Sequence, residues 1–254
     1  MGLNLKELQD RQAETAGGGG NFFRPKSGKK NMIRIFPFTH EVTKADVQSG
    51  QFKKDELGDE VEKLDRPVTL HYNYKGSKKP VISNAQVMKE YQEMDEDKAK
   101  EIRPTTKYFL NVVDTDDAES GMKIWGAPKS AYNAILEILL DPEYGGEDDL
   151  LGLKGRDFVV TFNKEASPGE MYGVLPRAEG NSEALSKSVL EGIRDLYDPK
   201  NLSLFGTVLA SRDEEVEAEE EKEEEAPPAK KKTTSDEDLD EFLDGKSKRK
   251  NGKK

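Results

Sequence analysis

A segment near the start of the chain, residues 21–38, combines cations with aromatic rings and contains no acidic residue. Its cations and rings are Arg24, Lys26, Lys29, Lys30, Arg34, Phe22, Phe23, Phe36 and Phe38. Basic side chains neutralise phosphates, and aromatic faces stack on unpaired bases. The segment therefore predicts contact with single-stranded nucleic acid. The alternative is an ordinary edge strand with solvated lysines. Within the strand we expect Ile33 and Ile35 to face the core and Arg34 and Phe36 to face the other way.

A second group of aromatic and basic residues follows at 72–79. It comprises Tyr72, Tyr74, Lys75, Lys78 and Lys79. Residues i and i+2 of a strand point to the same face, so the two tyrosines are expected to project together ahead of a basic turn. The alternative is that this face belongs to the core. A mixed outcome would bury one ring and expose the other.

A third group lies on two expected strands. It comprises Lys107, Tyr108, Phe109, Lys123 and Trp125. We expect Phe109 in the core and the other four near nucleic acid. A single tryptophan is buried at least as often as it is exposed, so Trp125 belongs either to the interface or to the core. This group supports nucleic-acid binding only together with the first two.

The end of the chain, residues 213–254, is too polar to fold alone and is expected to be disordered. Residues 213–225 are nearly all acidic, and residues 236–244 read DEDLDEFLD. In a transient helix Leu239, Phe242 and Leu243 would share one face, because they fall at i, i+3 and i+4. Such a peptide can dock in a basic groove with an apolar pocket on a partner protein. The alternative is a solubilising tail.

The net charge of −11 on 254 residues argues against a nucleic-acid binder, but the charge is unevenly distributed. Residues 213–254 hold sixteen acids and ten bases, whereas residues 1–107 hold twenty bases and seventeen acids. The distribution of charge decides which surface meets a polyanion, and the total does not. The acidic tail is expected to compete with nucleic acid for the basic surface.

Catalytic and metal chemistry have few candidate residues. The chain has no cysteine, which excludes disulfides and thiolate zinc sites. Its two histidines, His40 and His71, belong to no recognisable nucleophile motif. Asp114, Asp116 and Asp117 are more typical of a solvated turn than of a nuclease metal site. We expect no enzymatic activity, no cofactor and no metal.

Hydrophobic periodicity predicts the elements that hold these residues. Strands are expected at 32–38, 68–74, 107–114, 122–125, 157–162 and 171–175, and helices at 53–63, 84–102, 128–141, 182–196 and 198–212. Short strands with one strong helix predict a mainly β protein with peripheral helices, an α+β chain. Its expected architecture is a small, partly open β-barrel of the oligonucleotide-binding (OB) type. An α+β sandwich is the alternative.

The predicted organisation has three parts. Residues 1–20 form an arm, in which Leu3, Leu5 and Leu8 begin a short helix and glycines 17–20 form a tether. The arm is either frayed or a contact through which protomers self-associate along a strand. An OB-like core with a helical C-terminal part follows at 21–212, and the tail occupies 213–254. The N-terminus resembles no signal peptide, and no apolar run approaches the ~20 residues that span a bilayer, so a cytoplasmic protein without membrane contact is expected.

The order of these segments resembles one known family. A basic aromatic loop is followed by MIRIFPF, VTLHYNY, KYFLNVVD, KIW, a proline-started helix, DPEYGG and an acidic-hydrophobic tail. This order, over roughly residues 21–176 and again in the tail, resembles the replicative single-stranded DNA-binding proteins of tailed bacteriophages related to the T-even phages. The resemblance implies an OB fold that coats single strands cooperatively in replication, recombination and repair. It also implies an N-terminal arm for protomer contacts and a tail that recruits replication and recombination proteins, in the cytoplasm of an infected bacterium.

Two features depart from that family. Its members commonly hold a structural zinc with one histidine and three cysteines; here His71 stands where that histidine would, but residues 73–91 contain no cysteine. Packing would have to replace the metal, and the residues expected to provide it are Val81, Ile82, Val87, Met88 and Tyr91. The acidic peptide of the family also tends to be terminal, whereas GKSKRKNGKK follows it here.

Three functions are compatible with these residues. The first is binding of single-stranded DNA without strong sequence preference, which requires Phe22, Phe23, Tyr72 and Tyr74 to be accessible to bases. The second is RNA binding or a general nucleic-acid chaperone role, which uses the same side chains. The third is an acidic scaffold for basic proteins, which needs no nucleic-acid surface.

Overall fold

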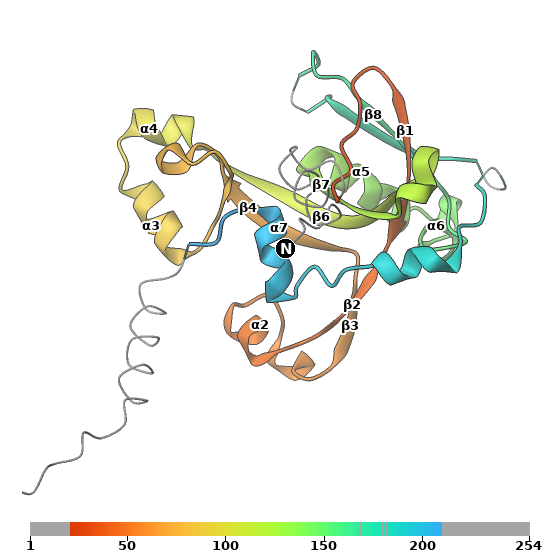
Figure 1. Cartoon of the computed structure of the whole chain (residues 1–254), viewed down its shortest axis with the longest axis horizontal. Coiled ribbons are helices and arrows are strands. Elements are labelled where there is room, and N and C mark those ends of the chain that lie inside the picture. Colours follow the sequence, from red (N-terminus) through yellow and green to blue (C-terminus); the bar gives the residue numbers. More distant parts are fainter. Residues whose placement is uncertain (1–20, 168, 179, 181, 210–254) are drawn as a thin grey trace, which may run out of the picture. The chain divides into compact units, whose positions relative to one another are not determined.

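The protein is mainly β, with helices arranged around the main sheet (Figure 1). The computed structural model describes residues 21–167, 169–178, 180 and 182–209. The predicted arm at 1–20 and the tail at 213–254, with Leu239, Phe242 and Leu243, lie outside these residues. In the part of the chain that the structure describes, every helix is too short or too polar to cross a membrane.

The elements follow one another along the chain as short strands and mostly short helices. The strands are β1 (Lys30–Phe36), β2 (Phe38–Glu41), β3 (Glu60–Lys63), β4 (Asp65–His71), β5 (Val81–Ile82), β6 (Pro104–Asp114), β7 (Met122–Pro128), β8 (Phe158–Phe162) and β9 (Tyr172–Pro176). The α-helices are α2 (Lys44–Gln48), α3 (Ala85–Gln92), α4 (Glu96–Glu101), α5 (Lys129–Leu140), α6 (Glu147–Leu150) and α7 (Leu202–Phe205). Single turns of 3₁₀ helix are η1 (Lys54–Glu56), η2 (Tyr74–Gly76), η4 (Pro142–Tyr144) and η6 (Pro199–Asn201), and longer ones are η3 (Thr115–Ser120) and η5 (Lys187–Gly192).

The long strand β6 organises the main sheet. Its residues 104–110 pair with β4 and its residues 111–114 pair with β1, so β4 and β1 lie end to end along one edge of β6. β7 pairs along the opposite edge. The order β5-β4-β6-β1-β8-β9 is antiparallel throughout, and the described strands do not close on themselves. β2 and β3 form a separate two-stranded ribbon.

Helix α5 covers one face of this sheet. Its buried residues Tyr132 and Ile135 pack on a cluster that includes Ile33, Leu110 and Phe158. The spacing of apolar residues along α5 gives one buried stripe, as the sequence predicted for this helix. The burial of Ile33 and Ile35 on this side of β1 confirms the expectation that both are core residues.

The opposite face is covered by residues 193–207, which we call the C-terminal strap. Leu196 and Phe205 of the strap pack on Phe109, whose predicted core position is thereby confirmed. The Arg66 guanidinium donates a hydrogen bond to the Leu196 carbonyl at 2.6 Å. At its end, Thr207 forms a parallel bridge with Val81, beside β5. The strap is thus part of the folded body rather than a loose leader to the tail.

Several expected elements differ from the observed ones. β4 ends at His71, three residues earlier than expected, because Asn73 and Lys75 have positive φ values of 58° and 47°. Left-handed backbone cannot continue a strand, so Tyr72 and Tyr74 do not share a strand face. The helix expected at 53–63 is η1 followed by β3, and pairing of β3 with β2 overrides its helical pattern.

The C-terminal helices also differ from expectation. The helix expected at 182–196 is η5 within an irregular stretch, and the one at 198–212 is η6 and α7. The apolar residues on which these helix predictions are based lie in the extended C-terminal strap, where they pack against the sheet. The helix expected at 84–102 is divided into α3 and α4 by residues 93–95.

Strand β9 is an edge of the sheet. The Arg177 N–H donates to the carbonyl of Asp157, just before β8, and the Asn163 N–H donates to the carbonyl of Met171, just before β9. Along an antiparallel strand, the N–H and C=O groups of successive residues point alternately toward and away from the neighbouring strand. The backbone groups of Tyr172, Val174 and Pro176 therefore point away from β8. Pro176 is one of these three residues, and as a proline it has no N–H group to offer at this edge.

The expectation that Arg34 meets nucleic acid is wrong, because its side chain is buried at 1 % exposure. Its guanidinium donates to Asp157 at 2.6 and 2.9 Å and to the carbonyls of Leu153 and Glu183. As predicted, Arg34 faces away from Ile33 and Ile35, but that side of β1 is enclosed rather than open to solvent. Arg34 therefore ties β1 to the segment before β8 and to the segment after β9.

Replacing Arg34 by methionine should lower the free energy of unfolding by about 3–5 kcal/mol, because Asp157 is left buried without its main partner. Urea unfolding followed by the fluorescence of buried Trp125 measures this loss. The matched control is Arg177→Met. Arg177 lies 3.5 Å from the other Asp157 oxygen but is partly exposed, so its loss should cost about 1 kcal/mol or less. Equal costs for the two substitutions would contradict the assignment.

Candidate nucleic-acid interface

Residues 24–30, which we call the basic loop, have a fixed conformation set by one buried side chain. The Asn31 amide nitrogen donates to the carbonyls of Lys26, Lys29 and Val160 at 3.1–3.2 Å. The Asn31 amide oxygen accepts the Lys26 N–H at 2.8 Å. Gly28, at a φ of 72°, makes the turn and donates its N–H to Phe162 at 3.0 Å. The loop is therefore held against β8 at two places, Val160 and Phe162, and is folded onto the Asn31 side chain.

The cations of the basic loop all point into solvent. Arg24, Lys26, Lys29 and Lys30 are exposed. Among the described residues, none of the four has an ion-pair partner. Because Asn31 is neutral, it fixes the backbone without neutralising these charges. The loop, red in Figure 1, thus carries four uncompensated positive charges at the start of β1.

The basic loop lies beside a pair of aromatic rings that the sequence interpretation did not include. Phe162 and Tyr172 stack with ring centroids 4.8 Å apart and an interplanar angle of 27°. Both are half-buried, and they sit opposite each other in the β8–β9 ladder. Lys164 follows, and its N–H contacts the Ser27 hydroxyl at 3.4 Å. The strands expected at 157–162 and 171–175 contained the necessary signal, since an antiparallel hairpin register places these two rings together.

The first two phenylalanines anchor the basic loop instead of extending from it. Phe23 is 5 % exposed and meets Trp125 edge-to-face with centroids 5.9 Å apart. Phe22 is half-buried and forms a bridge with Ile124 of β7. The expectation that Phe23 and Trp125 stack on bases is wrong, because both rings fill the core under α5. Hydrophobic burial at the root of the loop accounts for its aromatic content.

The second predicted group is split, as the mixed outcome allowed. Tyr72 is 40 % exposed, whereas Tyr74 is 2 % exposed and packs with Val81, Val87 and Ile102. The expectation that Tyr74 contacts nucleic acid is therefore wrong. Lys75, Lys78 and Lys79 are exposed on the turn that follows. Lys75 forms an ion pair with Glu90, which leaves the other two as free cations.

The third predicted group does not form a binding surface. Lys123 is paired with Asp114 and Asp117 at 3.6 and 3.7 Å. Tyr108 stacks on Tyr132 at a centroid distance of 4.0 Å. Lys107 is half-buried, and burial lowers its pKa. These contacts are internal, so the predicted roles of Lys107, Tyr108 and Lys123 find no geometric support.

The two exposed basic regions lie at opposite ends of the sheet. β1 starts near residue 114 of β6, and β4 ends near residue 104. Ten residues of extended strand span roughly 33 Å at ~3.3 Å per residue. The structure therefore does not bring the basic loop and the turn at 75–79 into one compact site. A ligand that meets both must be an extended chain.

The position of the family's zinc does not fit a metal here. The His71 Nε2 atom lies 3.2 Å from the Ser83 hydroxyl, and Nδ1 has no partner among the described residues. The histidine ring packs against Tyr74 and Tyr91 at centroid distances of 6.0 and 5.5 Å. Burial lowers the pKa of His71. Phenol rings and a hydroxyl replace thiolates as its neighbours, and this donor set is unsuited to zinc.

The other polar clusters have structural partners. His40 lies between Asp195 and Asp46, at 2.8 and 3.1 Å, and joins the strap to β2. Asp116 accepts the Met32 N–H at 3.4 Å, while its neighbours in the acidic turn pair with Lys123. Among the described residues, no group of three His, Cys, Asp or Glu side chains is arranged to hold a metal ion.

No family model matches this chain, and no curated protein is similar enough in sequence to count as a relative.

The Glu90 carboxylate should titrate far below its usual range. The Lys75 ammonium, the Tyr74 hydroxyl at 2.5 Å and the Gln86 amide at 3.0 Å all donate to it. These contacts lower the pKa of Glu90 from 4.5 to about 2. A depressed folded-state pKa gives stability that is present above pH 4.5 and is lost as the pH falls toward 2.

An NMR titration of the Glu90 carboxyl carbon measures this pKa directly. The Glu90→Gln variant is the control, and it should show a flatter dependence of stability on pH between 4.5 and 2. A Glu90 midpoint close to 4.5 would show that the contact with Lys75 does not persist in solution.

Proposed function

We propose that this protein binds single-stranded DNA through the basic loop, largely independently of sequence. The observation that carries the proposal is the set of exposed, unpaired cations at Arg24, Lys26, Lys29 and Lys30, held in place by Asn31. A fixed loop loses little conformational entropy when it meets a ligand. Its cations are suited to phosphates, and the Phe162 and Tyr172 rings beside it are suited to unpaired bases.

We further propose that the sheet is an OB-like, partly open barrel. Three features support this: the antiparallel order, a central β1 that pairs on both sides, and a helix, α5, packed across one face. OB folds bind about 4–16 nucleotides of single strand. A strand that ran from the basic loop to Tyr72, Lys78 and Lys79 would fall within that range, given a path of roughly 33 Å along β6.

The proposed mechanism is electrostatic tracking of the backbone with a few stacked bases. Contacts to phosphates fix the path of the strand but carry no sequence information. Stacking is tolerant of sequence because every base has an aromatic face. The protein would thus coat and protect single strands in replication, recombination and repair of the phage type that its sequence resembles. The acidic tail would recruit partner proteins and compete with DNA.

The direct test is fluorescence anisotropy of a labelled oligo-dT strand at several salt concentrations. The logarithm of the affinity should fall linearly with the logarithm of salt concentration. The double variant Lys29→Gln with Lys30→Gln should bind more weakly, and its slope should be smaller by about 0.7 for each lysine that meets a phosphate. The control Lys89→Gln removes an exposed charge from α3 and should leave the slope unchanged.

Matched RNA and duplex DNA strands separate the alternatives. Tighter binding to RNA of the same sequence would redirect the proposal to an RNA-binding role. Binding that is insensitive to salt, or absent for all three ligands, would remove it and favour an acidic scaffold.

Deleting residues 213–254 should tighten binding of oligo-dT, because sixteen acids and ten bases leave with the tail. The gain should shrink at high salt, since it is electrostatic. Anisotropy titrations of the full-length and shortened chains measure it. Unchanged or weaker binding after the deletion would exclude competition by the tail.

A further inference from the structure

The two ends of strand β1 carry opposite charge. At its start lies the basic loop, and directly after its end, at Pro37, lies a cleft bordered by carboxylates. The six steps from Lys30 to Phe36 span roughly 20 Å at ~3.3 Å per residue. Figure 1 shows the red loop at one end of β1 and the β2–β3 ribbon at the other. Positive charge therefore lies at the start of β1 and negative charge lies beyond its end.

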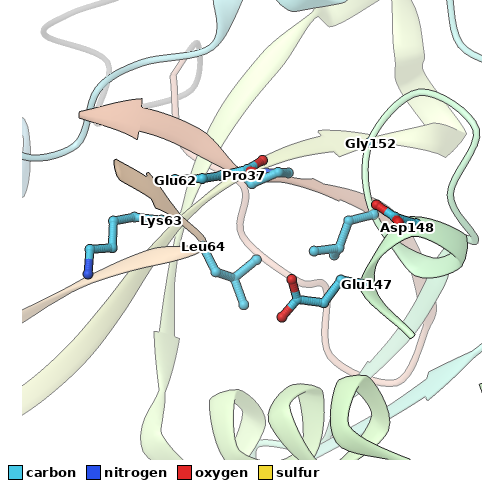
Figure 2. A pocket seen from close by; sticks show the side chains of 8 residues that line it. Pro37, Glu62, Lys63, Leu64, Glu147, Asp148 and Gly152 are labelled. Atoms are coloured by element: carbon cyan, nitrogen blue, oxygen red, sulfur yellow. The ribbon is translucent and has the colours of Figure 1, made fainter. Parts of the chain in front are cut away.

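The cleft has a volume of about 270 Å³ and walls from three parts of the chain. It is lined by Pro37, Glu62, Lys63, Leu64, Glu147, Asp148, Leu151 and Gly152. Figure 2 shows the Glu147 carboxylate, from α6, and the Leu64 side chain, from the β3–β4 bend, reaching toward each other across it. Its lining combines two leucines, Leu64 and Leu151, with three carboxylates. This combination suits a long cationic side chain, whose methylenes pack while its charge stays at the surface.

The carboxylates of the cleft are not neutralised within the body. Among the described residues, Glu62, Glu147 and Asp148 have no ion-pair partner. Lys63 lines the cleft, but its ammonium lies 4.9 Å from the ring centre of Phe52 and points away from Glu147 (Figure 2). Lys63, the cation among the lining residues, is thus engaged elsewhere, which leaves the acids of the cleft available to an external cation.

The fold explains part of this acidity. Glu147 and Asp148 occupy the first turn of α6, where negative charge is favourable. That explanation does not extend to Glu62, which comes from strand β3 and not from a helix. Neither does it account for Leu64 and Leu151 in the lining of the cleft.

We propose that the cleft receives the basic loop of a second copy of this protein. The two surfaces are complementary in charge, both are unpaired within one body, and both are present on every copy. Lys29 of one copy would lay its stem along Leu64 and place its ammonium beside Glu147. The fixed conformation of the loop favours this contact, since little ordering is required on association.

Such a contact joins different surfaces of the two copies. A head-to-tail interface of this kind builds an open chain of copies unless its rotation happens to close a ring. The free protein therefore forms chains whose length grows with concentration and falls with salt. One consequence rests on the proposed function: DNA that occupies the basic loop releases the chain into single copies.

Sedimentation velocity of the full-length protein at low salt, without DNA, tests the interface. Lys29→Glu and Glu147→Lys should each weaken self-association by at least about tenfold, because like charges then face each other. An equimolar mixture of the two variants should form chains in which the variants alternate. In that mixture each loop meets a cleft of opposite charge, whereas neither variant can pair with itself. The double variant, with both charges exchanged, should recover chain formation.

Lys129→Glu and Glu137→Lys are the matched controls, since both positions are exposed on α5 and belong neither to the basic loop nor to the lining of the cleft. Both controls should associate as the unaltered protein does. A protein that stays monomeric at low salt would overturn the proposal. Self-association that survives Lys29→Glu and Glu147→Lys, as an N-terminal arm would produce, would also overturn it. Because no DNA is present, neither outcome depends on whether the protein binds single strands.

Discussion

The pairing of strand β6 with three others is the constraint on which the rest of the structure depends. β4 and β1 use consecutive parts of one edge of β6, and β7 uses the other edge. This arrangement sets the distance between the two basic regions, because one follows the end of β4 and the other precedes β1. It also creates two separate sheet faces, one closed by α5 and the other by the C-terminal strap.

The cations of the described body fall into two groups, those paired with acidic side chains and those without an acidic partner. Arg34 and Lys123 are paired with aspartates and serve the fold. The cations of the basic loop are positioned indirectly, through the uncharged side chain of Asn31 and through rings at the root of the loop. The loop can therefore be rigid and strongly charged at once, which a network of ion pairs would not permit.

The sequence predicted most strands and the α5 helix, because their apolar periodicity is strong and local. It did not predict which face of a strand would be enclosed, since that depends on elements far away in the chain. The sequence predicts that Arg34 is a surface cation, because its partner Asp157 lies 123 residues later in the chain. The predicted exposure of Tyr74 is wrong because Asn73 and Lys75, whose φ values are positive, end β4 early. The sequence does not point to Phe162 and Tyr172, because these rings come to lie beside the basic loop only when β8 pairs with both β9 and the start of β1.

Unpaired strand edges can pair with those of another copy, which makes sheet-to-sheet fusion a hazard at high protein concentration. No described strand pairs with the outer edge of β9, which offers donors only at Tyr172 and Val174 before Pro176 interrupts it. Proline on an edge blocks the growth of a further ladder. Two donors are too few to template a stable new strand, so copies can crowd together without their sheets merging into aggregates.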